Sequence, residues 1–432
     1  MPASTALTPW SRSRQRARPI SAPAATARIL QRTAAVPGLT ERPMTADASA
    51  DMPVRSNLPA KRAARRRSDD LRISTCSAVK NEGPFLVEWV AWMHHIGATD
   101  LHIFTNDCTD GSDLILERLD EMGYLRHLPN PSTIMDTTQH QWTMLDFFNV
   151  MPRVKRSDWV MSVDVDEFIV VKTGAGKIAD LVERLPQAQA IVLNQLHFGG
   201  KGSMTYLPQQ LVTEANRWCQ HPGPEESKRR RGVKTLIRSD APVTRIMNHS
   251  PRLAPSVASL WVDGSGVPID FSVNEPGMKG MDARHAAYDL AQLNHYPLRN
   301  AETFLVKCAR GKVNLAHVEI GTQYWRKHDF AEAEDLTIQP HIPALRERVA
   351  DMLSDPELFS LHSASCAHHR ARINELRADE KFAKVYDEVL KYHQDKVLKG
   401  KADIIEDKAE VESTPAADNV DKPGRRKGGT SG

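Results

Sequence analysis

The pattern of hydrophobic positions divides the chain into four parts. Residues 1–70 show no sustained apolar period, whereas from Leu71 short β-branched runs alternate with amphipathic stretches. Such alternation is typical of a layered α/β domain. Further along the period becomes helical, and the last segment mixes charged residues, Pro and Gly without an apolar face. We therefore predict a disordered tail at 1–70, an α/β domain at 71–312, a helical C-terminal extension at 313–399 and a disordered tail at 400–432.

The same pattern predicts the individual elements. Strands are expected at Ile73–Val79, Leu101–Thr105, Tyr124–Leu128, Trp159–Val163, Phe168–Val171 and Ala190–Leu196. Helices are expected from Phe85 to Ile96, over Ser112–Met122 with Ser112 as N-cap, from Trp142 to Val150, and over Ala301–Val313, Tyr324–Ala331, Ile342–Leu353 and two stretches within Pro356–Leu398.

Composition is that of an ordinary globular protein, with 41% hydrophobic and 26% charged residues among 432. No apolar run approaches the roughly 18 to 20 residues that a transmembrane helix needs. Met1 is not followed by the basic and apolar regions of a secretory signal. The five cysteines are odd in number and form no CxxC pair. A reduced, cytoplasmic protein is the expectation.

Charge is distributed unevenly. Residues 1–70 hold 13 Lys and Arg against 5 acids, a net charge of +8; since the whole chain carries +3, the remainder carries −5. The basic tail is a candidate for contact with anionic lipid or nucleic acid, or for an organelle transit segment. It can equally be a solvated tail, or an over-extended start with initiation at Met44 or Met52. Because the predicted folded part is mildly acidic, we do not expect a nucleic-acid binder.

The strongest chemical signal is the acidic motif Asp164-Val165-Asp166-Glu167, which directly follows an apolar run. In an extended backbone Asp164 and Asp166 would point to one side and share a cation. Hard carboxylate oxygens select Mg²⁺ or Mn²⁺, ions that commonly hold the phosphates of a nucleotide. The plainer alternative is an acidic turn after a strand.

Two further predicted strands end in polar clusters. Lys80-Asn81-Glu82-Gly83 closes the first strand, and the segment from Thr105 to Ser112, which contains Asn106 and Asp107, closes the second. Open α/β sheets bind ligands at the carboxyl ends of their strands, so three such clusters describe one crevice. An Asx turn with a helix cap explains Asp110 to Ser112, but it explains Lys80, Glu82 and Asp107 less well.

Taken in order, these motifs resemble a known family. VKNE, TNDCTDGS, DVDEF, FGGKG at 198–202 and NHYPLRN at 294–300 are similar to motifs of the family-2-like glycosyltransferases, in particular the branch related to glycosyltransferase family 92. The resemblance spans about residues 73–312. It implies a GT-A fold, a Rossmann-like mixed sheet flanked by helices. It also implies metal-dependent transfer of a hexosyl-type sugar, with inversion, from a nucleotide-sugar donor, most simply a UDP-sugar, to a glycan or lipid-linked acceptor.

The resemblance also implies roles for particular residues in binding the nucleotide, the metal and the sugar. The nucleotide would contact Asn81, Glu82 and Asp107, and Lys80 and Asn106 of the same strand-end clusters are further candidates. The metal, Mn²⁺ or Mg²⁺, would be held by Asp164, Asp166 and His295, and the donor sugar would face Asp146 and Glu167.

The region after His295 adds positive charge. Lys307 and Arg310 lie three apart on a predicted helix, hence on one face, and are candidates for binding phosphate. Their alternative is a solvated helix face.

The acceptor base is unassigned. The family commonly supplies it from a Glu-Asp pair after the metal motif, but Glu334-Asp335 lies late in the helical region. His197, His249 and Asp263 are the remaining candidates, each also explicable as structural. A metal-dependent nucleotidyltransferase and an inactive nucleotide-sugar-binding protein are the alternative functions.

Overall fold

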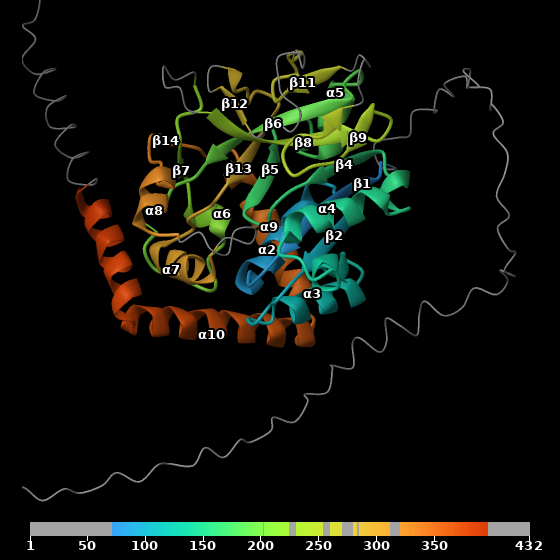
Figure 1. Cartoon of the computed structure of the whole chain (residues 1–432). Helices are drawn as coiled ribbons and strands as arrows, with labels where there is room; N and C mark the ends of the chain where they lie inside the picture. The colour runs from blue at the N-terminus through green and yellow to red at the C-terminus, as the bar shows by residue number, and fades with distance from the viewer. Residues whose placement is uncertain are drawn as a thin grey trace, which may run out of the picture. The chain divides into compact units, whose positions relative to one another are not determined.

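The computed structural model describes residues 71–201, 203–223, 230–253, 260–269, 280–282, 285–311 and 320–395. Both predicted tails, 1–70 and 400–432, lie outside the described residues. The described part contains one large mixed sheet with helices packed on it (Figure 1). The Rossmann-like mixed α/β fold expected from the sequence is therefore confirmed.

The large sheet runs in the order β3-β2-β1-β4-β8-β6-β13-β5, with β11 paired to β6 and β12 to β8. Its strands are β1 (Ile73–Val79), β2 (Asp100–Thr105), β3 (Arg126–Pro129), β4 (Trp159–Ser162), β5 (Glu167–Val171), β6 (Ala190–His197), β8 (Arg230–Arg238), β11 (Trp261–Asp263), β12 (Gly280–Asp282) and β13 (Ala291–His295). Small sheets join β9 (Val243–Arg245) to β10 (Arg252–Leu253), and β7 (Trp218–Cys219) to β14 (Ala333–Glu334).

The strand directions show which edge of the sheet holds the carboxyl ends of the parallel strands. β1 pairs in parallel with both β2 and β4, and β2 pairs in parallel with β3. The carboxyl ends of these four strands therefore meet at one edge, as expected for a nucleotide crevice. β8 runs antiparallel to β4 and β6, which makes the sheet mixed.

The described helices are α2 (Gly83–His95), α3 (Ser112–Glu121), α4 (His140–Val150), α5 (Ile178–Arg184), α6 (Val212–Ala215), α7 (Ala301–Arg310), α8 (Thr322–His328), α9 (Ile342–Met352) and α10 (Pro356–Ala378), with short 3₁₀ turns η2 (Pro131–Thr133), η3 (Val154–Arg156) and η6 (Gln339–His341). Helical backbone continues over 380–395. None of these helices is both long and apolar enough to span a membrane.

The start of α3 differs from its prediction. Gly111, in a left-handed conformation with φ of 82°, occupies the N-cap position, and Ser112 is the first helical residue. The side chain of Asp110 accepts the backbone N–H of Ser112 at 2.9 Å, and the Ser112 hydroxyl accepts the N–H of Glu82 at 2.9 Å. The hydroxyl thus joins the ends of β1 and β2 instead of capping its own helix.

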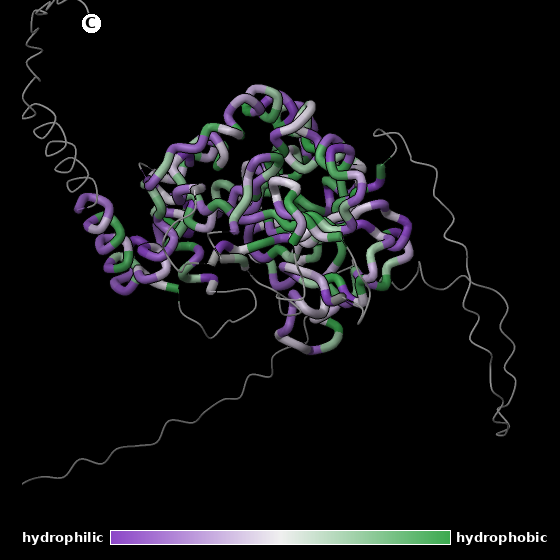
Figure 2. Tube along the Cα trace, turned by 90° about the horizontal axis from the view of Figure 1, so that it is seen from above, coloured by the Kyte–Doolittle hydropathy of each residue, from purple (hydrophilic) through white to green (hydrophobic). Residues whose placement is uncertain are grey.

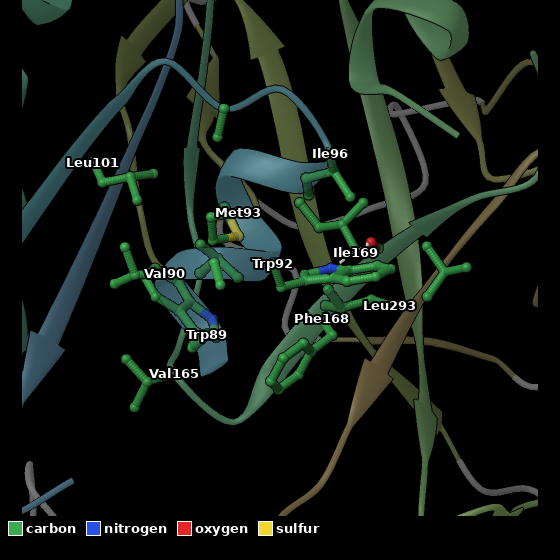
Figure 3. Packing of buried hydrophobic residues seen from close by; sticks show 14 of the residues in the cluster. Trp89, Val90, Trp92, Met93, Ile96, Leu101, Val165, Phe168, Ile169 and Leu293 are labelled. Atoms are coloured by element: carbon green, nitrogen blue, oxygen red, sulfur yellow. Dashed lines mark hydrogen bonds between the residues drawn. The ribbon is translucent and has the colours of Figure 1, made fainter. Parts of the chain in front are cut away.

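Helix α2 is buried along almost its whole length and fastens β5 to the core. The indole N–H of Trp89 donates to the Glu167 carbonyl, and that of Trp92 to the Ile169 carbonyl, both at 3.0 Å. Figure 3 shows Trp92 packed between Phe168 and Ile169, with this hydrogen bond dashed. Buried indoles with satisfied N–H groups hold a strand in a fixed register. The acidic motif at the start of β5 consequently sits on a rigid support.

The C-terminal helices share the core of the sheet. Ile342 and Leu345 of α9, with Leu358 and Ile373 of α10, belong to the same buried cluster as the residues of α2. In the tube view, hydrophobic stretches gather mainly inside the described part, and hydrophilic stretches dominate its periphery (Figure 2). Within the described part of 313–399, helices α9 and α10 are therefore packed against the sheet.

Candidate active site

The acidic motif forms a tight turn between β4 and β5. The N–H of Glu167 donates to the Asp164 carbonyl at 3.0 Å, and the N–H of Asp164 donates to the Glu167 carboxylate at 2.9 Å. Val163 and Val165 are buried, as predicted. The prediction that the two aspartates alternate along an extended strand is wrong, because the chain reverses here.

Each aspartate instead faces its own cation, and the cation of Asp164 is Lys234. The Lys234 side chain on β8 is fully buried, with Nζ 2.9 Å from Asp164 Oδ2 and 3.3 Å from Glu167 Oε2. It also donates to Asn248 at 2.7 Å. Burial disfavours the ammonium, but Asp164 and Glu167 outweigh it and raise the pKa of Lys234. Burial and the neighbouring aspartates raise the pKa of Glu167 despite Lys234.

Asp166 is surrounded by His295 and Lys307. Its Oδ2 lies 3.7 Å from His295 Nε2 and 3.5 Å from Lys307 Nζ. Burial alone would raise the pKa of Asp166, but these two neighbours hold it well below its ordinary value. His295 ends β13 and is placed beside Glu167 of β5 by antiparallel pairing. The structure therefore places Asp166 beside His295, two of the three metal residues that the resemblance implies, and beside Lys307, a phosphate candidate from its place on the predicted helix. Asp164, the third, pairs with Lys234 instead.

A buried ion cluster lies next to Asp166. The Glu82 carboxylate receives Arg299 Nη1 at 2.6 Å on one oxygen and Arg310 Nη1 on the other. Burial opposes ionisation, but the two guanidinium groups lower the pKa of Glu82 to about 2. Arg299 Nη2 and Arg310 Nε are buried without a hydrogen-bond partner among the described residues. Both arginines thus keep donors that an anion can use.

Backbone strain gathers at the same edge. The described residues include four non-glycine residues with positive φ, and three of them are Asn81 after β1, Asp107 after β2, and Arg299. Such conformations cost free energy and cluster at functional sites. Asn81 and Asp107 follow neighbouring parallel strands, and Lys80 reaches Asp107 at 3.4 Å.

Two cavities meet at these residues. The first is lined by Glu82, Asp166, Arg299, Lys307 and Arg310, among others, and encloses only about 20 Å³, room for about one water molecule. The second, of about 350 Å³, shares Asn81, Arg310 and His369 with the first and extends to Thr109 of the second strand end and to α10. Helix α10, for which the sequence indicates no role, therefore forms a wall of the candidate site.

One pair of these side chains would hold a divalent ion after a small shift. Octahedral ligands with bonds of about 2.1 Å lie about 3.0 Å apart when adjacent and about 4.2 Å apart when opposite, and the distance between Asp166 Oδ2 and His295 Nε2 is 3.7 Å. In the described part of the chain, no group of three or more His, Cys, Asp and Glu side chains is arranged to hold a metal. An ion here would take its other ligands from phosphate or water, as Mg²⁺ commonly does.

Two predicted nucleotide residues lie at the edge of the second strand. Asn106 is buried and donates to the Asp107 carboxylate at 3.1 Å, while its Oδ1 has no partner among the described residues. Asp107 is more than half exposed.

Asp146 lies elsewhere. It is exposed on α4, pairs with Arg245, and lines a separate open cavity of about 500 Å³ with Trp142 and Arg252. Glu167, its predicted companion toward the donor sugar, is buried beneath the turn. The structure does not bring these two carboxylates together around one space.

The three base candidates have structural contacts. The ring of His197 lies against that of His295 with centroids 4.8 Å apart and planes inclined by 54°, and burial holds the pKa of His197 well below its ordinary value. His249 Nδ1 lies 3.0 Å from the Val233 carbonyl. Asp263 accepts two backbone N–H groups of the turn after β11. No acceptor base is assigned by these contacts.

Lys234 and Arg299 are the site residues that sequence reasoning missed. Lys234 stands inside the apolar run Val233–Ile237, where a lone lysine is unusual in a buried strand. Arg299 lies inside the NHYPLRN motif. The position of Lys234 in an apolar run and that of Arg299 in the motif are the sequence features that could have identified them.

Comparison with known proteins agrees with the motifs. Residues 73–257 match the sequence model of glycosyltransferase family 92. Three curated relatives, each described as a glycosyltransferase family 92 protein, come from Oryza sativa subsp. japonica, Ricinus communis and Arabidopsis thaliana. They are 24%, 26% and 23% identical over 38%, 35% and 41% of this chain. The matches span only 26%, 27% and 30% of those relatives' own lengths.

Among solved structures, S. aureus TarS aligns with a TM-score of 0.24 and 12% identity, covering 39% of this chain and 28% of TarS. A second TarS structure, in complex with UDP, aligns with the same score and identity and is covered over 47% of its length. The S. cerevisiae mannosyltransferase Ktr4p aligns with a TM-score of 0.20 and 8% identity over 31% of this chain and 41% of its own. From its family-model match and its curated relatives, the chain resembles glycosyltransferase family 92, and its described part has a mixed α/β sheet, as the motifs predict.

Proposed function

We propose that the chain is a metal-dependent glycosyltransferase that moves a sugar from a nucleotide-sugar donor to an acceptor. The observation that carries the proposal is the arrangement at one sheet edge. The carboxylate of Asp166 and the cations Lys307, Arg299 and Arg310 line one small cavity beside the carboxyl end of β1. Acid and base side chains placed in this way suit a diphosphate with a divalent ion.

The nucleoside would occupy the cavity of about 350 Å³ beside Asn81, Thr109 and Arg310. Asn106 and Asp107 follow β2 in the same segment as Thr109, and would approach the nucleoside from that side. The diphosphate would then extend toward Lys307 and Asp166. Because the space around Asp166 holds about one water molecule, side chains there must move to admit phosphate. A UDP-sugar is the donor that the family resemblance favours.

The site must stabilise the negative charge that develops on the leaving diphosphate. Breaking the glycosidic bond leaves negative charge on the diphosphate, and Lys307, Arg299 and Arg310 stabilise that charge. Asp166 and His295 would hold Mn²⁺ or Mg²⁺, and the bound ion would supply Lewis-acid stabilisation of the leaving group. Asp164 would have to leave Lys234 to join them. Glu82 acts through its two arginines, whose guanidinium groups it positions.

The acceptor and the stereochemistry rest on the family resemblance. The acceptor would be a glycan or a lipid-linked molecule in polysaccharide, glycan or glycolipid assembly. The configuration of the transferred sugar would be inverted. A cytoplasmic location, with peripheral membrane contact through the basic tail 1–70, remains our expectation from the sequence.

A donor screen tests the proposal. Purified protein is incubated with several nucleotide sugars, with and without Mn²⁺, and release of nucleoside diphosphate is measured by chromatography. We expect metal-dependent release from at least one donor, which Asp166→Asn abolishes. Consumption of a nucleoside triphosphate with pyrophosphate release would indicate a nucleotidyltransferase. Binding of a donor without any turnover, unchanged in Asp166→Asn, would indicate an inactive binding protein.

A further inference from the structure

Exposed apolar side chains concentrate on one helix and the turn before it. The described residues include eleven large hydrophobic side chains that are exposed, and five of them fall within the seventeen residues 134–150. They are Ile134 (83% exposed), Met135 (67%), Trp142 (41%), Phe147 (42%) and Val150 (62%), which we call the α4 surface. Single exposed hydrophobic residues need no explanation, but a cluster of this kind marks an interaction site.

Helix α4 covers the sheet beside β1 (Figure 1) and buries a different set of residues. Met144, Leu145 and Phe148 pack into a core cluster with Cys76 and Phe104. At 100° per residue, Trp142, Phe147 and Val150 lie on the opposite side of the helix. The α4 surface is therefore a second face of the helix, apolar except for Asp146, which lies between Trp142 and Val150 and pairs with Arg245. The ring of Phe147 also meets Phe104 edge-on, with centroids 6.1 Å apart.

Positive charge borders the α4 surface at both ends. Beyond Val150, the exposed side chains of Lys155 and Arg156 form no ion pair with any described residue. At the other end, Arg252 lines the open cavity that Met135 and Trp142 also line, and it too has no ion-pair partner among the residues described. Two acids lie in the same segment. Asp146 is paired with Arg245, and exposed Asp136, next to Met135, offsets one of the three basic side chains.

We propose that the α4 surface docks on an anionic lipid bilayer, with its aromatic and aliphatic side chains in the interface and its lysine and arginines at the phosphate headgroups. A helix with an apolar face that includes Trp and Phe, bordered by basic residues, has the composition of interfacial membrane helices. Two other occupants are disfavoured by charge. A second copy packed on the same surface would oppose basic borders, and the tail 1–70 carries +8.

Docking in this way would bring the candidate site close to the bilayer. The turn that holds Ile134 and Met135 follows the carboxyl end of β3, which is the same sheet edge as Asp107 after β2. The proposal does not depend on glycosyltransferase activity, because it rests on exposed side chains away from the small cavity around Asp166.

Vesicle sedimentation with the full-length protein tests the proposal. Vesicles of phosphatidylcholine alone are compared with vesicles that also contain phosphatidylserine. The variants are Ile134→Ser/Trp142→Ser/Val150→Ser on the α4 surface, Lys155→Glu/Arg156→Glu at its border, and Leu207→Ser/Phe359→Ser as a control at exposed hydrophobic positions elsewhere. Circular dichroism and thermal unfolding confirm that each variant is folded.

We expect the wild type to bind the anionic vesicles and to bind phosphatidylcholine vesicles more weakly. The triple serine variant should lose at least about tenfold in partition coefficient and the charge-reversal variant a similar amount, with the control unchanged. Binding by the triple variant equal to that of the wild type would overturn the proposal and assign any binding to the basic tail. Absence of wild-type binding, or a self-association in sedimentation velocity that the triple variant alone loses, would also overturn it.

Discussion

The lowered pKa of Glu82 makes the stability of the protein depend on pH. Because its folded pKa of about 2 lies below the ordinary value, its ion pairs stabilise the protein above about pH 4.5. That stabilisation is about 3 kcal/mol at neutral pH by the size of the shift, and it is lost as the pH falls toward 2. We expect Glu82→Gln to reduce the free energy of unfolding at pH 7, with a smaller deficit at pH 3.

Urea denaturation at pH 7, 4.5 and 3 measures this difference. Glu121→Gln, which removes an exposed partner of Arg118, is the matched control and should show no comparable change. A deficit for Glu82→Gln that stays constant from pH 7 to pH 3 would contradict the assignment of this cluster.

The buried ammonium of Lys234 leads to a second prediction about stability. Removing its ammonium leaves Asp164 and Glu167 without their buried cation. We expect Lys234→Met to lower the free energy of unfolding by about 3 kcal/mol, since breaking a buried pair from one side is costly. The double variant Lys234→Met/Glu167→Gln should recover part of the loss. Equal destabilisation in the single and double variants, measured by urea denaturation, would show that the two groups are not coupled.

Among the elements, the loop after β6 depends on helix α8. A Cβ atom on Gly200 would lie 2.6 Å from the ring of Trp325, which is fully buried. Gly200→Ala should therefore lower the free energy of unfolding by about 1 to 3 kcal/mol through overpacking. Gly321→Ala, just before α8, is the matched control because no atom lies within 4 Å of its added Cβ. Thermal unfolding of the two variants measures the difference. Equal unfolding midpoints would contradict the close contact between Gly200 and Trp325.

Elements were more predictable from the sequence than contacts. The period of apolar positions predicts β1 with its observed bounds and places α2 and β2 within about two residues. The acidic motif was found from its residue types, but its turn was not, because Asp164 and Asp166 alternate with valines as a strand would. The pairing of Glu82 with Arg299 joins residues 217 apart, and no local pattern encodes such a distance.

For the whole molecule, helix α10 is expected to be indispensable. It supplies Leu358 and Ile373 to the central core and lines the cavity of about 350 Å³ with His369 and Arg372. Ending the chain at Ser354 should abolish cooperative unfolding, because it exposes this part of the core. Ending it at Lys399, which removes only the predicted C-terminal tail, is the control and should leave the unfolding midpoint unchanged. Cooperative unfolding of the shorter chain would contradict the shared core.

We propose that the carboxylate of Asp166 and its facing cations serve transfer from a nucleotide sugar. The most direct measurement is the rate of nucleoside diphosphate release from the best donor of the screen, with and without Mn²⁺, for the wild type, Asp166→Asn and the surface control Asp240→Asn. We predict metal-dependent release by the wild type and the control, and a rate at least about 100-fold lower for Asp166→Asn. Release by Asp166→Asn at the wild-type rate, equally with and without Mn²⁺, would contradict the account.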